Sequence, residues 1–187
     1  MPERYDNPRD IAQLMHQTKR LQQSAERSPF TGLVTLFCYV LWKDYRYSQK
    51  KLAEFCEQIH KYEDQWHDKP IDQIHDRLDD YAGWCVEYEE YTDKDFPHFR
   101  SKVAQKAIKE QIRCNNKIND LSTRYMTYGF CVLMDDGFGR RKLTNLKDKV
   151  QKQMNDVTKA GREKGIMDLW GELVDGAGIW IEKPVFD

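Results

Sequence analysis

Hydrophobic residues recur every three or four positions along most of the chain, which is the spacing of one face of an α-helix. Pro8 suits the first turn of a helix over residues 8–25. Residues 31–44 are apolar almost all round, so we expect a helix that is buried on every side. No stretch reads clearly as part of a sheet. The fold class that we predict is therefore all-α.

Similar stripes predict the later helices. Ser48 is a good N-cap for a helix over residues 49–66. After Pro70 a further helix would carry an apolar stripe made of Ile71, Ile74, Leu78, Tyr81, Cys85 and Tyr88. The pattern then predicts one long helix from Pro97 to Asp135, a helix over residues 143–157 and a short one over residues 166–173, with the tail Ile179–Ile181 extended.

The chain is similar to itself when it is displaced by 91 positions, because residues 39–59 then align with residues 130–150. After a four-residue shift, residues 78–87 resemble residues 173–182. Self-similarity of this kind indicates repeated units. We predict two copies, residues 1–93 and 94–187, each with a helix-turn-helix, packed as one compact unit about a pseudo-two-fold axis. The apolar helices Leu33–Trp42 and Tyr125–Met134 would lie at its centre. Chance similarity between two amphipathic helix pairs is the alternative.

The amino-acid composition narrows the class of protein and the cell compartment that we expect. The formal net charge is −1, so no overall field attracts nucleic acid or a membrane. The five cysteines are odd in number and form no Cys-x-x-Cys pair, as in reduced thiols of a cytosolic protein. The N-terminus has no apolar signal segment, and the most apolar run, residues 33–42, is too short to span a membrane. We expect a cytoplasmic protein, away from membranes and without cofactors.

A glycine-rich turn before a basic helix start is the main candidate site. Glycines permit close approach to the backbone, and a helix start presents free N–H groups to an anion. The residues predicted to bind a phosphate or a partner's carboxylate are Gly137, Gly139, Arg140, Arg141, Lys142, Lys50 and Lys51. The spacing is not that of a Walker loop. Alternatively, the cations are neutralised by Asp44, Asp135 and Asp136, and Phe138 is a packing anchor.

Charge also gathers in blocks along the chain. An acidic face that could bind a basic partner, or imitate nucleic acid, is predicted from Asp72, Asp76, Asp79, Asp80, Glu87, Glu89 and Glu90. Residues 100–117 and 140–164 are basic and could bind a phosphate backbone. The acidic and basic helices could instead face each other within the fold.

Three carboxylate and histidine pairs stand three residues apart, as in metal-binding bundles: Glu57 and His60, Asp64 and His67, Asp72 and His75. The second copy has Asp148 and Gln151 where the first has Glu57 and His60. We therefore expect surface histidines and no metal site, and we assign no catalytic residue.

Residues 132–143, which contain Asp136-Gly137-Phe138-Gly139, and residues 173–179 resemble small helical accessory proteins encoded by phages and prophages of Gram-positive bacteria. The first copy departs from this pattern at Tyr45, Tyr47 and Ser48. Some proteins of that class bind and inhibit host defence systems, including CRISPR nucleases. The resemblance implies a non-enzymatic protein that acts by stoichiometric protein binding, with a nucleic-acid enzyme as one candidate target. The alternative is a DNA- or RNA-binding accessory protein that uses its basic helices. The sequence is also compatible with a homodimer.

Overall fold

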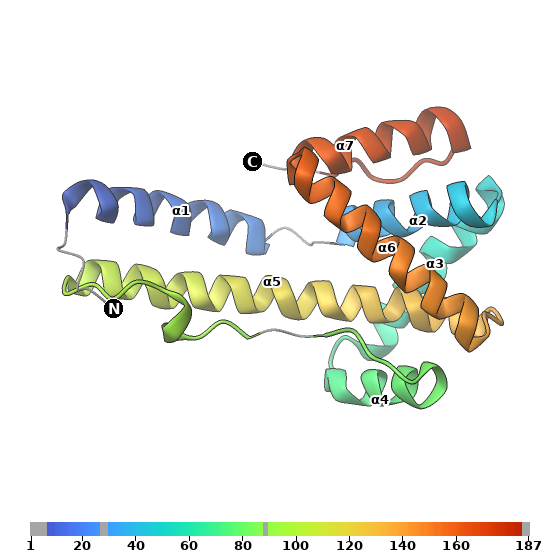
Figure 1. The fold of residues 1–187 in the computed structure, drawn as a ribbon, viewed down its shortest axis with the longest axis horizontal. Coiled ribbons are helices and arrows are strands. Elements are labelled where there is room, and N and C mark those ends of the chain that lie inside the picture. Colours follow the sequence, from blue (N-terminus) through green and yellow to red (C-terminus); the bar gives the residue numbers. More distant parts are fainter. Residues whose placement is uncertain (1–6, 27–29, 88–89, 185–187) are drawn as a thin grey trace. The chain divides into compact units, whose positions relative to one another are not determined.

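The computed structural model describes residues 7–26, 30–87 and 90–184, and Figure 1 shows the arrangement of its helices. The α-helices are α1 (Pro8–Glu26), α2 (Phe30–Tyr45), α3 (Gln49–Trp66), α4 (Ile71–Ala82), α5 (Lys102–Asp135), α6 (Arg140–Ala160) and α7 (Arg162–Glu172). A short 3-10 helix, η1, covers Asp93–Asp95, and a π-helical turn, η2, covers Leu173–Ala177. No strand occurs among the described residues. The all-α prediction is confirmed.

The chain forms two compact units. The smaller unit comprises Met1–Ser28, Tyr88–Leu121 and Val185–Asp187, and the larger unit comprises Pro29–Glu87 and Ser122–Pro184. Helix α5 contributes to both. This division does not follow the boundary expected between residues 93 and 94, because the second half of α5 packs among the helices of residues 29–87.

In the smaller unit, α1 lies along the first half of α5 (Figure 1). Asn7 accepts a hydrogen bond from the Arg9 backbone N–H at 3.1 Å and starts α1. The core contains Leu14 of α1 together with Phe99, Ala104, Ala107 and Ile108. Burial of these apolar side chains joins α1, α5 and the segment before α5.

In the larger unit, α2 and the second half of α5 form the centre, as their apolar sequences predicted. Phe37 packs edge-on against Phe130, with ring centroids 5.1 Å apart. Gly129 permits this contact, because a Cβ there would stand 2.8 Å from the Phe37 ring. Leu143, Leu146 and Val150 of α6 are fully buried, and α2 contacts α6, α7 and α3.

Two predicted helix boundaries are wrong. The helix after Pro70 ends at Ala82, before Cys85, because Gly83 adopts a left-handed conformation and its N–H bonds to the Asp79 carbonyl. The long helix begins at Lys102 instead of Pro97, since η1 is closed by a Thr92–Asp95 capping box and Phe99 turns into the core. Tyr88 and the expected break at Ser28-Pro29 lie outside the described residues. Ile179–Ile181 belongs to no helix or strand.

The two helix-turn-helix segments share local geometry at the offset of 91. Arg46 has φ 54° and Gly137 has φ 87°, so both turns place a left-handed residue at the same position. Ser48 caps α3 with φ −73° and ψ 162°, and Gly139 precedes α6 with φ −66° and ψ 161°. The Ser48 cap, whose hydroxyl accepts from the Lys51 N–H, is confirmed. The left-handed residue in each turn lets the chain reverse direction between two packed helices.

Candidate functional site

The glycine-rich turn of the larger unit is organised around Phe138, which is 3% exposed. Its ring lies 5.6 Å from that of Tyr45 and 6.3 Å from that of Tyr47. The Lys142 ammonium stands 3.6 Å from the Phe138 ring centroid, which is a cation–π contact. Phe138 is therefore a packing anchor, and Lys142 is drawn to the aromatic surface that it forms.

Arg140 is also held within the larger unit. Its Nε donates a 3.1 Å hydrogen bond to the Tyr81 carbonyl at the end of α4. The free carbonyls at a helix C-terminus attract a cation, so the guanidinium joins the start of α6 to the end of α4. Arg141 is exposed and, among the described residues, takes part in no hydrogen bond or ion pair. All three clustered cations are exposed, but among the described residues only Arg141 has no contact partner.

The aspartates expected to neutralise these cations have other partners. Asp44 pairs with Lys149 at 2.8 Å. Asp135 pairs with Arg77 at 2.5 Å and accepts a hydrogen bond from the Tyr62 hydroxyl. These contacts tie α2 to α6 and α5 to α3 and α4. The alternative interpretation is thus correct about Phe138 and wrong about the ion pairs that Asp44 and Asp135 form.

On the first turn, Lys50 forms an exposed ion pair with Glu54 at 3.8 Å. The Lys51 ammonium stands 5.5 Å from the Tyr47 ring centroid. Partial burial raises the pKa of Asp136, and the neighbouring Asp135 and Glu54 raise it further, while Lys51 opposes them. Burial likewise raises the pKa of Tyr47, to about 12. The predicted anion site is a surface on which cations are mostly engaged by aromatic rings and carboxylates.

The structure brings together only some residues of the predicted acidic face. Asp72, Asp76, Asp79 and Asp80 are all exposed on α4. Glu87 follows in the larger unit, Glu90 belongs to the smaller unit, and Glu89 lies outside the described residues. Although α4 contacts α6, no ion pair joins an acidic residue of α4 to a basic one of α6 in the described part of the chain. The four aspartates face solvent.

The first basic stretch forms a continuous face on α5. Its members are exposed and follow at intervals of four, three, four and four residues: Lys102, Lys106, Lys109, Arg113 and Lys117. At 3.6 residues per turn they fall within an arc of about 80°. The opposite side of α5 is buried in the smaller unit, through Ala104, Ala107, Gln111 and Cys114. We call these five cations the α5 basic face.

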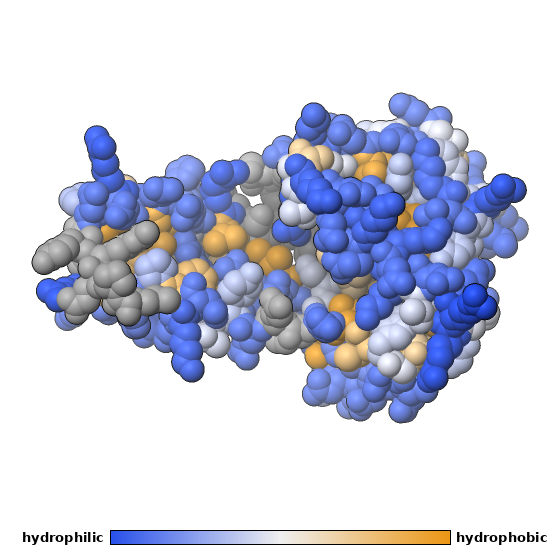
Figure 2. Space-filling model, in the orientation of Figure 1, coloured by the Kyte–Doolittle hydropathy of each residue, from blue (hydrophilic) through white to orange (hydrophobic). Residues whose placement is uncertain are grey.

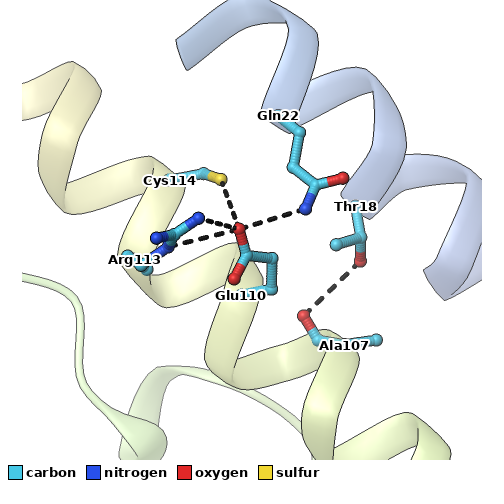
Figure 3. Close-up of polar contacts among 6 residues, drawn as sticks. All are labelled: Thr18, Gln22, Ala107, Glu110, Arg113 and Cys114. Atoms are coloured by element: carbon cyan, nitrogen blue, oxygen red, sulfur yellow. Dashed lines mark hydrogen bonds and ion pairs between the residues drawn. The ribbon is translucent and has the colours of Figure 1, made fainter. Parts of the chain in front are cut away.

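Glu110 is the one acidic residue between Lys102 and Lys117. Its Oε1 accepts hydrogen bonds from Gln22 of α1 at 3.0 Å and from Arg113 at 2.6 Å (Figure 3). These bonds lower the pKa of its carboxyl group, so it is charged and neutralises Arg113 locally. Within the described residues Lys102, Lys106, Lys109 and Lys117 take part in no ion pair or hydrogen bond. The four ammonium groups therefore face solvent.

A hollow of about 230 Å³ borders the α5 basic face in the smaller unit. Its lining residues are Asp93, Pro97, His98, Phe99, Gln105, Ile108 and Lys109. The Gln105 amide donates to the Phe99 carbonyl at 2.9 Å and fixes one wall. Lys109 thus belongs both to the hollow and to the basic face.

The second basic stretch, residues 140–164, is different. Besides Arg140 and Lys142, Lys147 lies over the Trp84 ring at 4.7 Å and Lys149 pairs with Asp44. The exposed cations that remain on α6 alternate with Asp148 and Asp156. Hydrophilic residues cover α6 on the side seen in Figure 2. This stretch is a mixed-charge surface and gives no continuous basic stripe.

The carboxylate and histidine pairs do not converge. His60 pairs with Glu63 at 3.6 Å instead of Glu57, and His67 pairs with Asp68 at 2.9 Å. No group of three potential metal ligands occurs among the described residues. In the same residues, no helix has the length and apolar character needed to cross a membrane.

Comparison of the chain with protein-family models, with curated proteins and with solved structures finds no match in any of the three. The sequence analysis identified the basic stretch 100–117. It did not predict that the cations share one face of the helix, although their spacing implies it. It also missed the approach of Cys38 to Cys56, because the two are far apart in sequence and meet only when α2 packs on α3.

Proposed function

We propose that this chain is a binding protein whose α5 basic face contacts the phosphate backbone of nucleic acid. The observation that carries the proposal is the row of five exposed cations with one tethered carboxylate. Lys102 and Lys117 are about 22 Å apart along the helix axis, which corresponds to about seven base pairs of B-form DNA. Side chains of this kind recognise phosphates and carry no base specificity, so the expected binding is insensitive to sequence.

A salt titration tests the proposal. The affinity for a short labelled duplex and a single strand is measured by fluorescence anisotropy at several salt concentrations. Four to five phosphate contacts give a log–log slope of about −4. In the variant Lys102→Gln, Lys106→Gln, Lys109→Gln, Lys117→Gln the slope becomes shallower by about 3 to 4, and low-salt affinity falls about a hundredfold.

A matched control removes the same charge from the second basic stretch: Arg141→Gln, Lys152→Gln, Lys159→Gln, Lys164→Gln. It should change affinity and slope far less than the α5 variant. Equal losses in both variants would mean that charge alone matters, and the assignment of the α5 face would be wrong. A wild-type protein that binds neither duplex nor single strand at low salt overturns the proposal.

A second candidate function is stoichiometric binding of a protein, for which the phage resemblance suggests a defence nuclease as target. One observation favours it. Trp180 is 84% exposed, while Ile179 and Ile181 on either side are buried and the Trp170 indole donates to the Ile181 carbonyl at 3.0 Å. A fixed, outward tryptophan is a common anchor of protein interfaces. Its test is DNA cleavage by a purified CRISPR nuclease with increasing wild-type protein or Trp180→Ala. Equal inhibition by the two would remove Trp180 as the anchor, and inhibition by neither would remove a CRISPR nuclease as the target.

We also propose that the two helix-turn-helix segments are copies related by a pseudo-two-fold axis. The matching left-handed residues Arg46 and Gly137 support it. So does the exchange of partners, since α2 contacts α6 through Asp44 while α5 contacts α3 through Asp135, and Asp44 and Asp135 are equivalent at the offset of 91. Tyr47 and Phe138, also equivalent, touch each other as residues beside such an axis would.

A further inference from the structure

Two cysteine thiols meet inside the larger unit. The Sγ atoms of Cys38 on α2 and Cys56 on α3 are 3.6 Å apart, although the residues are 18 positions apart in sequence. A disulfide requires a sulfur–sulfur distance of about 2.0 Å, so the two atoms need to approach by roughly 1.5 Å. All five cysteines are free thiols, and among the described residues no other sulfur–sulfur contact is found.

The two thiols differ in environment. Cys38 is completely buried, whereas Cys56 is partly exposed. A hydrogen bond from Cys38 lowers the pKa of the Cys56 thiol, and the same contact together with burial raises the pKa of the Cys38 thiol. The thiolate is the reactive form of cysteine. The accessible member of the pair is therefore the one that reacts first, with a second sulfur held beside it.

We propose that Cys38 and Cys56 are a reversible oxidation site, at which hydrogen peroxide converts the two neighbouring thiols into a disulfide between α2 and α3. The site does not depend on the proposed function, because it lies in a different unit from the α5 basic face.

The reaction has two steps. The Cys56 thiolate attacks one peroxide oxygen, so that an S–O bond forms, the O–O bond breaks and the leaving hydroxide takes up the thiol proton as water. The Cys38 sulfur then attacks the Cys56 sulfur, forming the S–S bond while the S–O bond breaks and a second water leaves with the Cys38 proton. The two thiols lose two electrons, which the peroxide gains.

The disulfide would close a loop that contains the first turn, with Arg46 and Tyr47. Gly129 and Lys147 occupy the positions equivalent to Cys38 and Cys56 in the second helix-turn-helix. Oxidation would therefore lock one of the two similar segments and leave the other unchanged. A crosslink of this kind stabilises a fold by restricting its unfolded chain.

The test is a peroxide titration of the folded full chain, followed by denaturation, alkylation of remaining thiols and mass spectrometry. The expected result is that two of the five thiols are lost together, before the other three. Peptide mapping should show a Cys38–Cys56 link that dithiothreitol reverses. Sulfenic acid that accumulates at Cys56 without a link to Cys38, or loss of Cys85 at the same rate, overturns the proposal.

Cysteine variants separate the proposed role of Cys56, which reacts first with peroxide, from that of Cys38, which then forms the link. Cys56→Ser should leave Cys38 free to be alkylated at the same peroxide dose. Cys38→Ser should leave a Cys56 sulfenic acid that dimedone traps, with no link. Cys85→Ser is the matched control and should form the link as the wild type does. Oxidation of Cys38 in Cys56→Ser contradicts the proposed order. If Cys38→Ser does not fold, wild-type mapping still decides whether the pair forms.

Discussion

The two basic stretches of this protein are similarly rich in cations, but the fold surrounds those cations differently. On α5 the lysines stand on the side of a helix whose other side is buried, and they meet solvent. At the start of α6, Arg140 bonds to the end of α4 and Lys142 lies on the Phe138 ring. A dense group of cations at a helix start is electrostatically unfavourable unless something nearby compensates it. In the larger unit the fold itself provides that compensation.

This difference shows why charge density alone is a poor guide to a binding site. The cations near residue 140 attract notice in the sequence because glycines flank them, yet most of them have partners within the fold. The cations near residue 109 follow an ordinary helical spacing but have almost no internal partners. A binding surface needs charges that the fold leaves unpaired, and α5 has more of them.

The largest expected effect comes from removing the aromatic anchor of the turn. Phe138→Ala should lower the free energy of unfolding by about 3 kcal/mol, because the ring is buried and also holds Tyr45, Tyr47 and Lys142. Urea denaturation followed by circular dichroism measures it. Val103→Ala, at a site 54% exposed on α5, is the control and should change stability by less than about 0.5 kcal/mol. A loss below 1 kcal/mol in Phe138→Ala would contradict the anchor role.

Hydrophobic periodicity predicted the α-helices of the larger unit and most of its core, because residues such as Leu52 and Leu143 repeat at helical spacing and lie on the buried faces of those helices. It failed at Pro97, where a polar segment with one buried ring, Phe99, resembles a helix start. The hydrogen bond from Arg140 to the Tyr81 carbonyl could not be predicted, since it depends on how α4 packs against α6. Nor could the division into units, which follows from α5 belonging to both.

The turn backbone offers the next test. A Cβ at Gly137 would meet nothing within 4 Å, so Gly137→Ala probes only the cost of φ 87°. The expected loss is about 1 to 2 kcal/mol, because a left-handed conformation brings Cβ against the carbonyl. Arg46→Gly, at the equivalent position with φ 54°, should change stability by no more than about 0.5 kcal/mol. If both changes destabilise equally, the two turns are not equivalent. Thermal denaturation of the pair decides it.

Arg140 and Arg141 allow cations with and without a partner in the fold to be compared at adjacent positions. Arg140→Gln should lower stability by about 1 kcal/mol through loss of its hydrogen bond to the Tyr81 carbonyl. Arg141→Gln should leave stability within about 0.5 kcal/mol of the wild type. Both variants should bind nucleic acid as the wild type does. If Arg140→Gln bound nucleic acid more weakly with unchanged stability, the glycine-rich turn would be the binding site instead.

The smallest expected effect is the part of the alkaline pH dependence that Tyr47 of the turn contributes. Burial and the nearby Asp136 raise the pKa of Tyr47 to about 12, whereas an unfolded tyrosine ionises near 10. The folded state therefore holds this proton more tightly. Its contribution to stability is complete below about pH 10 and is lost as the pH rises from about 10 to about 12. Tyr47→Phe should flatten the fall in melting temperature over that range, and Asp136→Asn should shift the tyrosinate absorbance titration downward. The four-lysine α5 variant should titrate as the wild type does, because those lysines lie in the other unit and Tyr47 is perturbed by its own neighbours. An unchanged alkaline transition in Tyr47→Phe would show that the pKa of Tyr47 is the same in the folded and unfolded states.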